Sequence, residues 1–270
     1  MGTVYTTEYS NWQESLNLLL DATELKKKLP GNTGTILIKP NLVEALVPPI
    51  TTPVGLIEAL VQYLRKITGS RILIGEGTGA MNYETFHCFQ ELGYTELARQ
   101  HDVELVDLNK EVLVHLEKKE CMRWPEMYLP RIALESFLIS VPVLKAHTLA
   151  GVTLTMKNMM GLAPPSHYRQ GNSWKKSAFH NRIHDAVADL NRYRTPDFTL
   201  LDATIGMPGA HLWGPVCDPP INMLAAGYDP VAIDAYGTGL LRKNWQDIGH
   251  IHSLHGELGT AEPLDVIEVR

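Results

Sequence analysis

Apolar and polar residues follow one another along this chain in an order that predicts strands and helices in turn. Short runs rich in branched apolar residues are typical of buried strands, and they occupy residues 35–38, 71–74, 103–106, 137–141, 198–201 and 222–226. Apolar residues at helical spacing lie between or after them, over 56–64, 84–99, 180–193 and 230–241. Residues 109–130 are charged and poorly periodic, so their structure is left open.

The alternation of strands and helices favours an α/β fold, a mostly parallel sheet with helices on both faces and right-handed crossovers. The 270 residues, 44% of them hydrophobic, support a substantial core. No linker clearly divides the chain, so we expect a single α/β domain over 1–270, with division into two lobes left open. Residues 163–179 are polar and begin with two prolines, and we interpret them as a lid, with a simple surface loop as the alternative.

Polar residues follow several of the predicted strands. Ligands of open parallel sheets bind beyond the carboxyl ends of the strands. By this rule, we expect one edge of the sheet to carry the polar residues that follow five strands: Lys39 and Asn41, Gly75 and Glu76, Asp107, Lys145 and His147, and Asp202. For any one of these residues, a solvated loop or a helix cap is the competing interpretation.

The segment 142–162 carries the most chemistry, because Lys145, His147, Lys157 and Asn158 follow the apolar run 137–141. Lys145 and His147 are two residues apart, so in an extended exit loop their side chains would point the same way. We predict Lys145, His147 and Lys157 as catalytic residues. The predicted substrate-binding residues are Lys39, Asn41, Glu76, Asn158, His180 and Asp202.

The residue types suggest a ligand class. Lys39, Lys145 and Lys157 would place three positive donors near a small carboxylate or phosphate. A crowded or buried lysine has a lowered pKa and serves as a base or a Schiff-base nucleophile. His147 is a candidate general acid or base, or a metal ligand as a neutral imidazole. Surface lysines and a loop histidine are the competing interpretations.

Evidence for cofactors is weaker. His180 and His184 are four residues apart on a predicted helix, and His250, His252 and His255 form a second group, so a transition metal stays open. Cys88, Cys121 and Cys217 are widely separated, which disfavours an iron–sulfur cluster within a single chain. The turn 75–79 reads G-x-G-x-G, which matches neither a dinucleotide fingerprint nor a P-loop. The cofactor is therefore left unknown.

Charge and hydropathy limit the partners. A net charge of −6 and a pI near 6.0 argue against a nucleic-acid or membrane-surface role. No apolar run approaches the length of a membrane span, and the first residues lack the pattern of a secretory signal. We therefore expect a cytoplasmic location and a small-molecule partner, and leave a homo-oligomer open.

Several short motifs resemble those of domain-of-unknown-function family 362 over residues from about 35 to 260. They are K-P-N at 39–41, T-T-P at 51–53, G-E-G at 75–77, P-V-L-K-A-H at 142–147, T-L-T-M-K-N at 153–158, Gly161, D-A at 202–203 and D-P-V-A-I-D at 229–234. The resemblance implies a soluble α/β domain in a family described as iron–sulfur related, because some members carry an added ferredoxin-like module. This chain departs from those members in having no clustered cysteines. The architecture is also distantly similar to the nickel-pincer lactate racemases, without a matching cofactor-attachment motif.

We therefore expect an enzyme that acts on a small anionic substrate by lysine and histidine acid–base chemistry, with the reaction unassigned. Isomerase, lyase and oxidoreductase chemistry all fit these residues. The alternative is an accessory or carrier protein for an iron–sulfur or other metal centre, without catalysis of its own.

Overall fold

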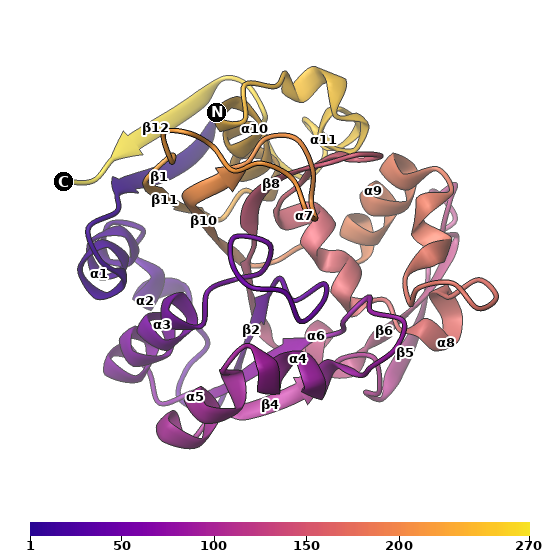
Figure 1. The fold of residues 1–270 in the computed structure, drawn as a ribbon, viewed down its shortest axis with the longest axis horizontal. Helices are drawn as coiled ribbons and strands as arrows, with labels where there is room; N and C mark the ends of the chain where they lie inside the picture. The colour runs from indigo at the N-terminus through magenta and orange to yellow at the C-terminus, as the bar shows by residue number, and fades with distance from the viewer.

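The computed structural model describes residues 1–270 and is built around one mixed sheet of ten strands (Figure 1). The strand order is β12-β1-β11-β10-β7-β2-β3-β4, and β8 joins β10 at one side and pairs with β9. The strands of this sheet are β1 (Gly2–Glu8), β2 (Thr35–Pro40), β3 (Arg71–Glu76), β4 (Glu104–Asp107), β7 (Phe137–Val141), β8 (Val143–His147), β9 (Gly151–Thr153), β10 (Phe198–Met207), β11 (Met223–Gly227) and β12 (Leu264–Glu268).

Six of the nine strand pairings in the sheet are parallel, and only those of β11 with its two neighbours and of β8 with β9 are antiparallel. The predicted α/β fold is confirmed. The first and last strands, β1 and β12, lie side by side at one edge of the sheet, and the two termini lie at opposite ends of this parallel pair (Figure 1).

Helices cover both faces of the sheet because successive side chains of a strand point to opposite faces. In β2, Ile36 and Ile38 face one hydrophobic core and Leu37 faces the other. The first core lies under α1 (Trp12–Ala22), α3 (Val54–Ile67), α4 (Thr85–Glu91) and α5 (Tyr94–His101). The second lies under α6 (Arg131–Glu135), α7 (Thr155–Asn158), α9 (Ile183–Tyr193), α10 (Pro230–Leu240) and α11 (Gly249–Leu254).

Short elements complete the chain. They are α2 (Leu25–Lys28), α8 (Pro165–Tyr168), the 3-10 helices Met159–Leu162, Ser177–His180 and Trp245–Asp247, and the separate antiparallel hairpin of β5 (Leu113–Glu117) and β6 (Glu126–Pro130). The hairpin occupies the region whose structure the sequence left open. None of the helices combines the length and the hydrophobicity that crossing a bilayer requires.

Three predicted elements differ from the observed ones. The helix predicted over 84–99 is two helices, because Gly93 adopts a left-handed φ of +82° between them. The helix predicted from 180 begins at Ile183. The strand predicted to end before Asp202 continues to Met207, because the Asp202 carboxylate is satisfied within the strand by the backbone N–H (2.9 Å) and hydroxyl (2.7 Å) of Thr204.

Lys145 and His147 lie on a strand, β8, and not in an exit loop as predicted. This strand pairs with β10 on one side and with β9 on the other, so both residues are held in a ladder. As alternate residues of one strand they still project to the same face. The sheet therefore fixes their direction more firmly than a loop would.

Candidate functional site

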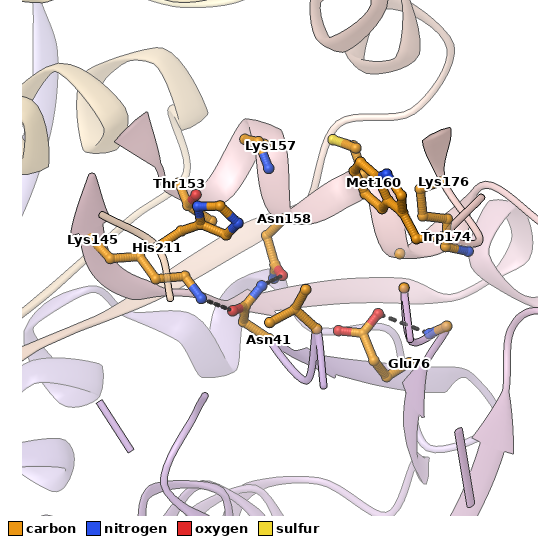
Figure 2. A pocket seen from close by; sticks show the side chains of 14 residues that line it. Asn41, Glu76, Lys145, Thr153, Lys157, Asn158, Met160, Trp174, Lys176 and His211 are labelled. Carbon is orange, nitrogen blue, oxygen red and sulfur yellow. Dashed lines mark hydrogen bonds between the residues drawn. The ribbon is translucent and has the colours of Figure 1, made fainter. Parts of the chain in front are cut away.

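A cavity opens where β2, β3 and β8 meet α7 and the segment after it. The cavity has a volume of about 60 Å³. Figure 2 shows its side chains, which come from segments far apart in the sequence. The lining residues are Asn41, Val43, Glu76, Gly77, Gly79, Lys145, Thr153, Lys157, Asn158, Met160, Gly161, Trp174, Lys176 and His211.

A buried ion pair forms the floor of the site. The Lys39 ammonium, fully buried, donates to both carboxylate oxygens of Glu76 at 2.9 and 2.8 Å. The same carboxylate accepts the backbone N–H groups of Leu42 (3.2 Å) and Gly77 (2.8 Å). Lys39 does not line the cavity, and its pKa is lowered because burial outweighs the attraction of Glu76. Glu76 is thus already neutralised by a protein cation.

Two asparagines connect this pair to Lys145. Asn158 accepts hydrogen bonds through Oδ1 from Lys39 (3.3 Å) and from the Asn41 amide (3.0 Å). Asn41 in turn accepts through Oδ1 from the Lys145 ammonium at 2.8 Å, as drawn in Figure 2. Lys145 also donates to the carbonyl oxygen of Ile50 at 2.5 Å. One hydrogen-bonded network therefore holds five of the predicted site residues.

Three lysines line the cavity, and each has a lowered pKa. Burial and the charge of Lys157 lower the pKa of Lys145 to about 7, and burial alone lowers that of Lys157 to about 8. Burial likewise lowers the pKa of Lys176 to about 7. Lys145 and Lys176 donate to protein oxygens, whereas Lys157 has no hydrogen-bond acceptor within the protein. None of the three forms a salt bridge with a carboxylate.

His147 is buried, and its hydrogen bonds define its tautomer. Its Nδ1 atom accepts the backbone N–H groups of Leu149 and Ala150, each at 3.1 Å. Since backbone N–H groups can only donate, the ring proton of the neutral imidazole lies on Nε2. Burial and the charge of Lys157 drive the pKa of His147 far below its usual range. A neutral ring with its proton on Nε2 donates a hydrogen bond there, and it offers no lone pair to a metal at that atom.

Two further histidines stand beside His147. The His211 ring stacks on it with centroids 4.1 Å apart, and His180 lies 5.8 Å from it against Trp174. Burial first, and the charge of Lys157 second, lower the pKa of both rings to about 4. Sequence reasoning included His180 and missed His211. Extending the strand through Asp202 to Met207 would have placed His211 just beyond a strand end.

Asp202 and Asp107 lie outside the cavity lining, as do His147 and His180, which departs from the predicted grouping. Asp202 bonds to Thr204 on its own strand, and burial raises its pKa. Asp107 accepts the Thr85 hydroxyl at 2.6 Å and the backbone N–H of Asn109 at 3.0 Å. The Oδ1 atoms of both carboxylates therefore accept hydrogen bonds from neighbouring groups of the chain, whereas Asp107 Oδ2 is buried without a hydrogen-bond partner.

The glycine-rich turn after β3 does not present free amides to a phosphate. Its amides at Gly77, Thr78, Gly79 and Ala80 donate to Glu76, Thr85, Val43 and Thr78. Close packing explains the glycine at 77 instead, since a Cβ there would lie 2.3 Å from the Gly161 carbonyl oxygen. Gly161 itself packs on the ion pair, where a Cβ would lie 1.9 Å from Glu76 Oε1.

The segment 163–179, the predicted lid, is attached to the sheet side of the cavity by two buried lysines. Lys175 donates to the carbonyl oxygens of Ala80 (2.6 Å) and Tyr83 (2.5 Å). Lys176 donates to the Asn109 side chain and to the carbonyl oxygen of Ala163. Trp174, just before them, lines the cavity (Figure 2). The segment thus contributes a wall of the site.

The predicted metal groups do not assemble. His184 faces His250, with the two Nδ1 atoms 3.1 Å apart, while His180 belongs to the group around His147. The pair of His180 and His184 fails because residue 180 precedes the helix. No three His, Cys, Asp or Glu side chains come together in an arrangement that would hold a metal ion. The thiols are separate, and burial raises the pKa of Cys88 and Cys121 to about 11.

The fold and site define an α/β protein with a lysine-rich cavity beyond the carboxyl ends of its strands. A family profile described as Domain of unknown function (DUF362) matches residues 36–239. The chain therefore belongs to the DUF362 family. No curated protein matches the chain significantly.

Two solved structures are similar to this chain. The lactate racemase apoprotein of Thermoanaerobacterium thermosaccharolyticum is 13% identical, with a TM-score of 0.55, over 90% of this chain and 57% of that one. This chain thus spans somewhat more than half the length of that enzyme, and at this identity the likeness concerns the fold. A protein from Thermotoga maritima is 11% identical, with a TM-score of 0.38, over 74% of this chain and 52% of that one.

Proposed function

We propose that this protein is an enzyme that binds a small carboxylate or phosphate in the cavity and moves a proton to or from it. The observation that carries the proposal is a charge imbalance. Lys145, Lys157 and Lys176 line the cavity, while its one carboxylate, Glu76, is already paired with Lys39. Buried charges are ordinarily paired. An anionic ligand would supply the missing counter-charge.

The size of the cavity supports a small ligand. Its volume of about 60 Å³ exceeds the roughly 10–15 Å³ that a single water needs, so the cavity has room for a small molecule. A short carboxylic acid is a ligand of this class. The lactate racemase of similar fold is an enzyme named for a small hydroxy acid, which agrees with this ligand class.

The roles of the side chains follow from their hydrogen bonds. Lys145 is held by Asn41 and Ile50, so we assign it to anion binding. Lys157 has a pKa of about 8 and no acceptor, so we assign it as the base. His147, which the sequence favoured as the acid or base, becomes a neutral hydrogen-bond donor through Nε2.

Titration calorimetry with phosphate, acetate and lactate tests the binding step. An anion favours the charged lysines, so we expect proton uptake on binding and a Kd that rises as the pH increases through about 7 to 8. Lys145→Met should weaken binding by about tenfold or more, the loss of one charge-assisted hydrogen bond. Lys119→Met, at an exposed position, is the matched control.

Proton transfer is tested separately, by proton NMR of small hydroxy and oxo acids incubated with the protein in D2O. Exchange of a carbon-bound hydrogen next to the carboxylate or carbonyl group is expected with the wild-type protein and should be lost in Lys157→Met. Anion affinity unchanged by pH and by Lys145→Met would refute the proposed site. If the acids bind and none exchanges a carbon-bound hydrogen, the protein binds anions without catalysing proton transfer, and the proposed enzyme activity is refuted.

A further inference from the structure

Lys157 differs from every other buried lysine near the cavity. Lys39, Lys145, Lys175 and Lys176 all donate to protein oxygens, whereas Lys157 has none to donate to. Its side chain is half-buried and lines the cavity, as Figure 2 shows. An amine without a hydrogen-bond acceptor is free to turn toward a ligand.

The backbone that carries Lys157 is firmly held. The first two N–H groups of α7, from Thr155 and Met156, donate to the buried carboxylate of Asp234 at 2.7 and 3.0 Å. Asp234 belongs to α10, so this contact fixes the short helix α7 against a longer one. The next residue, Asn158, is held by the network around the ion pair. Lys157 is therefore an amine without a protein acceptor on a firmly held backbone.

A lysine becomes a nucleophile when it loses its proton near neutral pH, and burial beside another cation produces that state. Burial lowers the pKa of Lys157 to about 8, and Lys145 lines the same cavity as a second amine. The neighbouring groups also suit a carbonyl substrate. His211 lines the cavity, and its pKa of about 4 leaves its ring neutral at pH 7, a state in which an imidazole N–H can polarise a carbonyl oxygen.

We propose that Lys157 forms an imine with a small oxo acid whose carboxylate is bound by Lys145. This inference deepens the proposed function and rests on it. The Nζ lone pair bonds to the carbonyl carbon, and the carbon–oxygen double bond breaks. The two protons that the neutral amine loses leave with the carbonyl oxygen as water, so no other reactant is needed. The imine withdraws electrons from the adjacent carbon, which makes its hydrogen easier to remove, so with an oxo acid Lys157 promotes the proton transfer through the imine and does not act as a free base.

Reductive trapping tests the imine. The protein is incubated with pyruvate and sodium cyanoborohydride, and the adduct is located by intact mass and by peptide mapping. We expect one adduct per chain, on Lys157. Lactate, which has the same carboxylate and no carbonyl, is the matched ligand and should give none. Lys157→Met should lose the adduct, Lys145→Met should reduce its yield about tenfold through weaker binding of the carboxylate, and Lys119→Met should leave it unchanged.

The wild-type map alone decides the question, whatever the stability of the variants. An adduct absent from Lys157, or spread over exposed lysines in proportion to their exposure, would overturn the imine. Calorimetry separates this failure from that of the proposed function. If pyruvate and lactate both bind with Lys145-dependent affinity and no adduct forms, anion binding stands and covalent chemistry is refuted.

Discussion

Replacing Glu76 by glutamine should destabilise the protein strongly, because the neutral amide would leave the Lys39 ammonium buried without a counter-charge. Lys39 is 0% exposed and Glu76 is 3% exposed, with 2.8 Å between their closest atoms. Breaking a buried pair in this way costs about 3–5 kcal/mol of unfolding free energy. The exposed pair of Arg71 and Glu104 provides the matched control, since Glu104→Gln should cost less than about 1 kcal/mol.

Urea unfolding at pH 7 measures both free energies, and Lys39→Met with Glu76→Gln in one chain completes a double-mutant cycle. The double variant has no buried charge at this site, so it should be more stable than Glu76→Gln alone. The penalty in Glu76→Gln should also shrink as the pH rises, since an unpaired Lys39 deprotonates in the folded state before the unfolded one. A cost equal to that of Glu104→Gln would refute this account of the ion pair.

Two further predictions concern the packing around this pair and the support of Lys157. Gly161→Ala should lower the unfolding free energy by about 1–3 kcal/mol in thermal or urea unfolding, because its Cβ would collide with Glu76 and Lys39. Gly239→Ala, in α10 with no atom within 4 Å of the added Cβ, should instead stabilise by about 0.5–1 kcal/mol, and equal effects would contradict the packing argument. Asp234→Asn should lower the unfolding free energy by about 1–3 kcal/mol, because the Asp234 carboxyl group holds the start of α7. It should also weaken anion binding measured by calorimetry. Unchanged stability and affinity would show that α7 needs no such support.

The central strands could be predicted from sequence, and so could five of the residues that line the cavity, Asn41, Glu76, Lys145, Lys157 and Asn158, because both depend on local pattern. A run such as 36–38 is apolar throughout since it is buried on both faces, and polar residues follow where the strand leaves the core. The strand-end rule then brings Asn41, Glu76 and Lys145 together without knowledge of any contact. The DUF362 resemblance rested on the same segments, and it is confirmed.

The remaining features depend on contacts between distant residues, which periodicity does not record. Nothing in the sequence indicates that Lys39 pairs with Glu76, 37 positions away, or that Asn158 joins it to Asn41. The sequence places Asp202 in the site because a charged residue usually ends a buried strand. In the structure Thr204 donates two hydrogen bonds to the Asp202 carboxylate, and the strand continues to Met207. His211 was missed for the same reason, since the strand that positions it was ended too early.

The network also explains why neighbouring lysines take different roles. Lys145 uses two of its three N–H donors on Asn41 and Ile50, so its ammonium is fixed in position with one donor left for a ligand. The same contacts would hinder a nucleophile, whose lone pair must approach a carbon atom. Lys157 keeps no such contacts, and burial lowers its pKa to about 8. Binding and reaction therefore fall to different lysines, because the asparagine network reaches one of them and stops short of the other.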